Sequence, residues 1–241
     1  MTLRKISVIF AIGFVAAALH SCDDGDIYEE YAVSNTDGLT VKFKGKLTGT
    51  DNWSNSYSLV IAGFADTEYS VVQKVLPSSH EGENDVEVIL SNIGSDVKTI
   101  EFCVTNKLRE RIVTFHSHEL TGNESDTVTI DVGTMDVGMY ATIQKNIFNT
   151  TCTQCHGGAT GKPAAGLLLT EGMSHAALVN RPSAKIEGET LVVPGDAERS
   201  ILHKTINTGY DLPLRFDHTN MISNSNWLTL IDKWIDNGAK E

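Results

Sequence analysis

The alternation of apolar and polar side chains predicts β-strands in the first half of the chain. Leu39, Val41, Phe43 and Leu47 alternate with threonine and lysine residues, which places the apolar set on one face of a strand. Further short runs of this kind lie at 57–65, 69–76, 85–90, 98–105, 111–115 and 127–132. Segments rich in asparagine, aspartate, serine, glycine and proline separate the runs, and these residues favour turns. The pattern therefore predicts about seven short strands.

Residues 38–136 are accordingly predicted to form an all-β domain of the immunoglobulin-like sandwich type. Such a sandwich needs roughly seven short antiparallel strands in about 100 residues. The segment contains no Cys-Trp-Cys framework of the antibody kind, so the sequence leaves the strand order open.

After Gly138 the apolar residues follow a helical period. Tyr140, Ile143 and Ile147 share one face of a first helix. Asp196 and Ser225 are candidate N-caps of two later helices. The last helix carries an apolar face made of Trp227, Leu230, Ile231, Trp234 and Ile235. Residues 138–241 are therefore predicted to form a second, all-α domain.

The first 21 residues are predicted to be a signal peptide. Arg4 and Lys5 precede an apolar run of 14 residues, which is too short for a membrane span of roughly 20 residues. The run ends in Leu19-His20-Ser21-Cys22, which resembles the lipobox of bacterial lipoproteins. Cys22 would then carry the lipid and tether an exported protein to a membrane, with the outer membrane as the expected location, on its periplasmic or its outer side. The alternative is an ordinary secretory signal beside an unrelated cysteine.

The net charge of the chain limits the kinds of molecule that it is expected to bind. The chain has 19 basic and 31 acidic residues, and removal of residues 1–21 takes away two basic residues, which leaves a formal charge of −14. This balance provides no basic stripe for phosphates, so nucleic acid is not an expected partner. Acidic residues concentrate in 22–37, which is predicted to be a solvated tether and which also resembles the surface-export signal of lipoproteins in the Bacteroides group.

The string Cys152-Thr153-Gln154-Cys155-His156 is the most specific motif in the chain. A chain of this composition contains a C-x-x-C-H string by chance about 0.002 times. The two cysteines have the spacing that forms thioethers with the two vinyl groups of haem, and the adjacent histidine is placed to bind the iron. One covalent haem c is therefore the predicted cofactor.

Three other interpretations of the motif fit the sequence less well. A redox dithiol needs a strand before the motif, whereas here a helix precedes it. A zinc site needs a further ligand at a regular spacing, which His175 does not provide. A structural disulfide between Cys152 and Cys155 gives His156 no role.

Two features of residues 38–136 are weaker indications of a functional site. His116 and His118 share a strand face and, with Glu101 or Glu119, are a candidate metal site, although polar surface is the better explanation of such a pair. Cys103 alternates with apolar neighbours and is expected to be a small, partly exposed strand residue.

The order of motifs from Gly138 to Ala239 resembles the small c-type cytochrome domain found in lipoproteins and multidomain proteins of Bacteroides relatives and planctomycetes. Besides the C-x-x-C-H string, the resemblance lies in segments 147–148, 165–169, 192–196, 200–202 and 234–239. It implies an all-α c-type cytochrome domain over residues 138–241. It also implies that Cys152 and Cys155 attach the haem and that His156 is the proximal iron ligand.

The chain departs from that family at the distal iron ligand. Where the family has a Met-Pro dipeptide, this sequence reads Asp211-Leu212-Pro213-Leu214, and leucine cannot bind iron. Met221 and His218 are the candidate distal ligands; a histidine would lower the reduction potential relative to methionine. Further possibilities are His203, Met173, His175 and an open site.

Electron transfer by a membrane-anchored c-type cytochrome is the predicted function, with an unidentified redox protein as partner and no enzymatic activity. The first alternative is a haem-based sensor of small ligands, or a peroxide-reactive module, with an open sixth iron position. The second alternative is a surface binding or adhesion module in which the haem domain is accessory.

Overall fold

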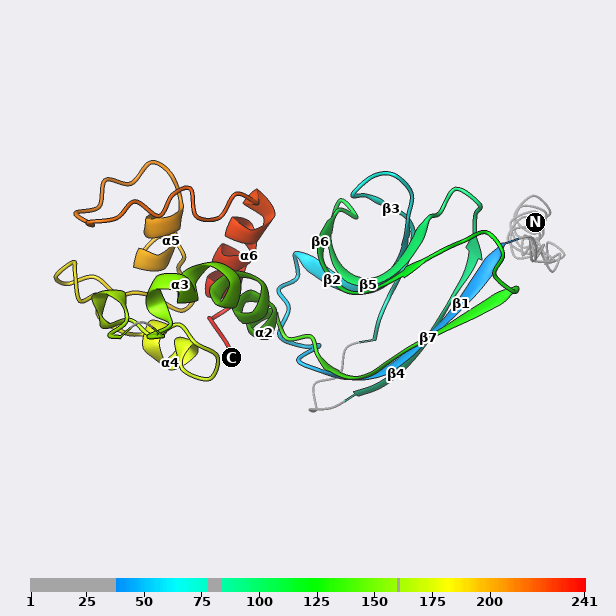
Figure 1. Ribbon diagram of the computed structural model, residues 1–241, viewed down its shortest axis with the longest axis horizontal. Coiled ribbons are helices and arrows are strands. Elements are labelled where there is room, and N and C mark those ends of the chain that lie inside the picture. Colours follow the sequence, from blue (N-terminus) through cyan, green and yellow to red (C-terminus); the bar gives the residue numbers. More distant parts are fainter. Residues whose placement is uncertain (1–37, 78–83, 160) are drawn as a thin grey trace, which may run out of the picture. The chain divides into compact units, whose positions relative to one another are not determined.

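The computed structural model describes residues 38–77, 84–159 and 161–241 (Figure 1). All of them belong to one compact unit, residues 37–241. The predicted signal peptide, the lipid-bearing Cys22 and the acidic tether lie outside the described residues. Within the described part of the chain, no helix combines the length and the apolar character that a membrane crossing requires.

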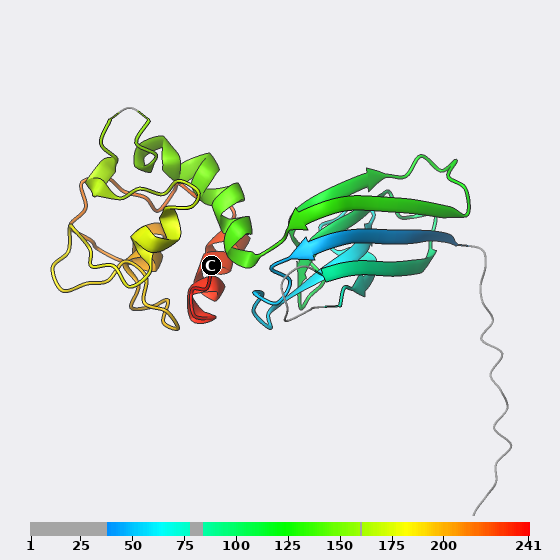
Figure 2. The same cartoon turned by 90° about the horizontal axis from the view of Figure 1, so that it is seen from below.

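The described residues form seven strands in two sheets. They are β1 (Leu39–Thr48), β2 (Tyr57–Phe64), β3 (Ser70–Val75), β4 (Asn84–Ile93), β5 (Thr99–Asn106), β6 (Arg111–Glu119) and β7 (Thr127–Asp136). The first sheet has the order β4-β1-β7 and the second has the order β3-β2-β5-β6 (Figure 1). In Figure 2, β1 lies between its two neighbours; it pairs antiparallel with β4 and parallel with β7.

The apolar faces of the strands form the core of this region. Val41, Phe43 and Leu47 of β1 are fully buried, as the alternation predicts. The Phe102 ring packs between Phe43 and Phe115, with ring centres 4.8 and 5.1 Å away. Aromatic contacts of this kind join side chains from both sheets and hold the sheets against each other.

Strand β5 is buried on both faces, which corrects the expectation for Cys103. Its side chain is fully buried and packs with Val60, Ala62 and Phe64 instead of reaching solvent. On the same face, the buried carboxylate of Glu101 accepts hydrogen bonds from Arg111 and from Thr114. Burial of an unpaired carboxylate costs free energy, so these hydrogen bonds are what makes a buried Glu101 tolerable in the fold.

The fold-class prediction of an immunoglobulin-like sandwich followed by an all-α cytochrome c-like domain is wrong. The described chain is mostly β-sheet, and its helices are few and short. No large all-α domain is present in the described ranges. The physical reason is that apolar residues between 157 and 224 come in small groups separated by glycine and proline, which disfavour long helices, so the helical segments described there have only three to six residues.

The helical segments after β7 are α2 (Met139–Ile143), η1 (Gln144–Cys152), α3 (Thr153–His156), η2 (Ala164–Gly166), α4 (Ser174–Leu178), α5 (Ile201–Ile206) and α6 (Ser225–Asp236). Helix α6, with 12 residues, has an amphipathic pattern and buries Leu230, Ile231, Trp234 and Ile235. Its N-cap is Asn224, whose side chain accepts a hydrogen bond from the backbone N–H of Asn226, and not the predicted Ser225. Asp196 is likewise not the N-cap of α5, because Ser200 holds that position.

Candidate cofactor site

The C-x-x-C-H motif lies at the end of a continuous run of helix. Segments α2, η1 and α3 follow one another without a break, and the nine residues of η1 are π-helical. Such π segments are rare and occur often at functional sites. Cys152 is the last residue of η1, whereas Cys155 and His156 belong to α3. The run ends at Gly157, where a Cβ atom would collide with the carbonyl group of Thr153.

A buried polar network holds this run of helix in place. The Tyr140 hydroxyl lies 2.5 Å from the Ser174 hydroxyl, and Ser174 in turn donates to the Gln144 side chain. The Gln144 amide donates to the carbonyl of Leu169 at 3.0 Å. The backbone N–H of Leu169 donates to the carbonyl of His156 at 2.8 Å. These contacts tie both ends of the run to the segment that follows the motif.

The His156 ring is oriented by two backbone carbonyls. Its Nδ1 atom lies 3.1 Å from the oxygen of Ala164 and 3.2 Å from the oxygen of Leu167. Since carbonyl oxygens only accept, Nδ1 carries the proton and the lone pair resides on Nε2. Histidines that bind metals are oriented in this way, with one nitrogen donating to a carbonyl and the other facing the metal. The left-handed backbone of Ala165, with φ of 53°, forms the turn between these carbonyls.

Two cavities meet at His156. The first, of about 670 Å³, is lined by both motif cysteines, His156 and a mostly apolar set that includes Ile206, Pro213, Phe216 and Ile222. The second, of about 620 Å³, is lined by residues such as Leu167, Ala177, Leu191 and Ile201. Five residues line both cavities: His156, Ala165, Lys185, Leu214 and His218. Each volume lies within the range of roughly 300–1,000 Å³ that is typical of sites for organic ligands.

The linings suit a large apolar ligand with anionic groups. Phe216 and Met221 of the first cavity and Met173 of the second are exposed apolar side chains, with 55, 38 and 53% of their surface accessible. Large apolar side chains grouped on a hollow surface indicate a binding site. Basic residues also line the two cavities, namely Arg181, Lys185 and Arg215.

His218 is the second imidazole of the site. Its ring centre lies 6.3 Å from that of His156, and the two ring planes differ by 28°. Its Nδ1 atom is buried and has no hydrogen-bond partner in the described structure. Burial, together with the nearby His156, lowers the pKa of His218, which favours the neutral imidazole that a metal requires.

Met173 lines only the second cavity, and the two other histidines named as possible iron ligands line neither. His203 is hydrogen bonded through both ring nitrogens, to Asp232 at 2.7 Å and to Tyr210 at 3.0 Å. His175 binds the carbonyl of Ala239 at 2.7 Å. Neither histidine lines either of the cavities described above. In the described ranges, moreover, no three His, Cys, Asp or Glu side chains lie close enough together to bind a metal ion. The candidate metal site at His116 and His118 is therefore not formed.

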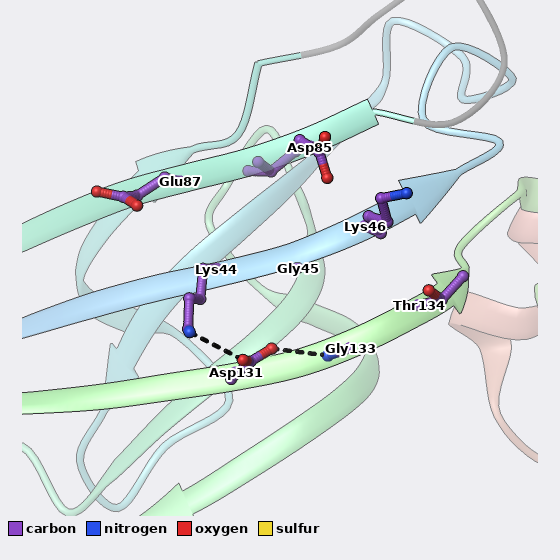
Figure 3. A pocket seen from close by; sticks show the side chains of 9 residues that line it. Lys44, Gly45, Lys46, Asp85, Glu87, Asp131, Gly133 and Thr134 are labelled. Carbon is purple, nitrogen blue, oxygen red and sulfur yellow. Dashed lines mark hydrogen bonds and ion pairs between the residues drawn. The ribbon is translucent and has the colours of Figure 1, made fainter.

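A separate hollow on the first sheet has a different character (Figure 3). It has a volume of about 390 Å³ and is lined by residues of β1, β4 and β7. Lys44 of β1 and Asp131 of β7 form a cross-strand ion pair in it, at 3.0 Å. Asp131 also accepts a hydrogen bond from the backbone N–H of Gly133, which is the main reason that its pKa is lowered. Pairs of this kind are typical of a solvated sheet face.

Comparison with known proteins adds no further assignment. The chain matches no protein-family model, no curated protein and no solved structure. Sequence reasoning identified the cysteines and both histidines, but it missed the basic residues of the cavities and the carbonyls of Ala164 and Leu167, because neither group belongs to a recognisable motif.

The two motif cysteines are expected to differ in reactivity when the chain carries no haem. Cys155 is exposed, whereas burial raises the pKa of the Cys152 thiol to about 11. Only the thiolate reacts with iodoacetamide, so at pH 8 Cys155 should be alkylated first. The rate at Cys152 should rise about tenfold per pH unit between pH 8 and pH 10. Mass spectrometry of peptides from a pH series checks this order, and equal rates at pH 8 would contradict it.

Proposed function

We propose that this protein is an electron carrier that binds one haem covalently through Cys152 and Cys155 and holds its iron with His156. The observation that carries the proposal is the cavity lined by all three residues of the C-x-x-C-H motif, in which the carbonyls beside His156 leave Nε2 free for a metal. The proposal rests on this site and does not require an all-α fold.

The residues present fit such a group. The thiols of Cys152 and Cys155 are spaced to add across two vinyl groups, each forming one S–C and one C–H bond without need of an oxidant. His156 supplies a nitrogen lone pair, and its orientation is fixed by the two carbonyls. Arg181, Lys185 and Arg215 are placed to pair with carboxylate groups at the edge of the ligand.

When bound, the haem supplies a one-electron couple. The protein then has to keep water away from most of the ring while one edge stays close to the surface. The apolar linings serve the first purpose. The exposed Cys155 serves the second, because a thioether at this residue brings one edge of the ring to the surface, where a redox partner protein can approach.

The same proposal includes export and a membrane tether. The signal-like residues 1–21 and the lipobox-like cysteine at position 22 support attachment through a lipid at the N-terminus. Export also accounts for covalent attachment, since a haem bound by thioethers is not lost outside the cell. The partner is expected to be another redox protein, with no role for nucleic acid.

Spectroscopy of the full chain tests the function directly. The protein is expressed with a cytochrome c maturation system, and the reduced form is recorded alone, in alkaline pyridine and under CO. We expect a haem that survives acid-acetone extraction, a pyridine spectrum of the two-thioether type and no reaction with CO. Ready CO binding by the native protein would instead favour the sensor or peroxide-reactive function, and absence of covalent haem would refute both.

A further inference from the structure

His156 and His218 approach the same space from two different segments. His156 lies at the end of α3, whereas His218 lies in the irregular segment 207–224 between α5 and α6. Both side chains line both cavities. A flat ligand centred between the two rings would therefore extend into the cavity with the cysteines on one side and into the second cavity on the other.

We propose that His218 is the second axial ligand of the haem, so that the iron is held between two histidines. This inference rests on the proposed haem attachment and deepens it. Metal–imidazole bonds of about 2 Å place two nitrogens on one metal about 4 Å apart, and with roughly 1 Å more to each ring centre the centres lie about 6 Å apart. The observed separation of the ring centres is 6.3 Å, and the planes differ by 28°.

The unmet bonding capacity of His218 is a second, independent observation. Its buried Nδ1 atom has no hydrogen-bond partner among the described residues. A buried polar atom without a partner costs free energy, so native structures retain one where something else satisfies the group. Coordination of the iron through Nδ1 would satisfy this atom.

The local structure also presents His218 to the site. The Asp217 carboxylate accepts hydrogen bonds from the backbone N–H and the hydroxyl of Thr219, at 2.9 and 2.8 Å, and so forms a tight turn around His218. The Phe216 ring packs edge-on against the imidazole, with ring centres 5.0 Å apart. These contacts restrict the ring to the orientation from which it lines the cavities.

Met221 is the competing ligand, and its position is less suitable. Its side chain lines only the cavity that contains the cysteines and does not reach the second one. It is also 38% exposed, whereas His218 is partly buried between the cavities. Leu214 also lines both cavities, but leucine cannot bind iron. Of the five shared residues, only His156 and His218 carry an imidazole.

The test uses the full chain, matured with haem. Near-infrared magnetic circular dichroism of the oxidised protein distinguishes bis-histidine from histidine–methionine ligation without any substitution, and we expect the bis-histidine signature. His218→Ala should convert a protein inert to CO into one that binds CO fully when reduced. His218→Met should shift the near-infrared band to the methionine type and raise the reduction potential, because a methionine ligand favours the reduced iron. His118→Ala, at a histidine that lines neither cavity, is the matched control and should change none of these readouts. Met221→Ala should keep the bis-histidine near-infrared signature.

Two results would overturn the inference. A histidine–methionine signature in the unaltered protein, abolished by Met221→Ala, assigns the ligand to Met221. CO binding by the unaltered protein shows an open site. If His218→Ala retains no haem, the near-infrared spectrum of the unaltered protein and that of His218→Met still decide the question. Absence of covalent haem in the unaltered chain refutes the proposed function itself. This result differs from that of a protein in which haem is attached but a residue other than His218 binds the iron.

Discussion

Replacing both Cys152 and Cys155 by serine is expected to abolish covalent haem attachment completely. The reason is chemical: serine cannot form a thioether with a vinyl group, so only non-covalent contacts and His156 would remain to hold the ligand. The measurement is haem staining of the denatured protein on a gel, with intact mass spectrometry to detect the attached group. Each single variant should keep the haem through the remaining thioether, in lower yield.

Cys103→Ala provides the matched control. Cys103 is also a cysteine of the described chain, but it is buried among Val60, Ala62 and Phe64 and lines neither cavity. This variant should stain for haem as strongly as the unaltered protein. Covalent haem in the double serine variant, or its loss in Cys103→Ala, would contradict the assignment of the attachment site.

Trp234→Ala is expected to destabilise the protein by about 3–5 kcal/mol, the usual cost of removing a large buried aromatic side chain. Trp234 of α6 is 2% exposed, and its ring centre lies 5.0 Å from that of Tyr140 in α2. Its indole N–H also donates to the carbonyl of Lys240 at 2.7 Å. The substitution removes this donor, so the Lys240 carbonyl loses its hydrogen bond. The loss therefore combines a cavity with a missing hydrogen bond.

Urea unfolding followed by circular dichroism measures this loss. Leu108→Ala is the control, because Leu108 is 73% exposed and its removal should change the free energy of unfolding by no more than about 0.5 kcal/mol. Trp234→Phe should fall between the two, because it keeps an aromatic ring but loses the N–H donor. A loss below about 1 kcal/mol for Trp234→Ala would show that the contact between α2 and α6 contributes little to stability.

Helix caps and burial show where local patterns were sufficient and where they were not. The apolar alternation of β1 identified Val41, Phe43 and Leu47 as core residues, because a side-chain period of two is a property of each strand alone. The same reasoning failed for Cys103, because β5 is covered on both faces and only the packing of other residues decides that. Asn224 replaced Ser225 as the cap for a similar reason, since neighbouring residues compete for this role and helix boundaries shift by a residue or two.

By itself the sequence determined the positions of the seven strands, the final helix and the C-x-x-C-H motif, because each depends on residues close together in the chain. Only the tertiary structure decided the pairing of β1 with β7, the absence of a large all-α domain from the described ranges and the approach of His218 to His156. Sixty-two positions separate these two histidines, and no local pattern records which distant side chain meets which. Long-range packing determines which side chains meet, because separate segments bury apolar surface against each other and satisfy each other's hydrogen bonds only in the folded structure.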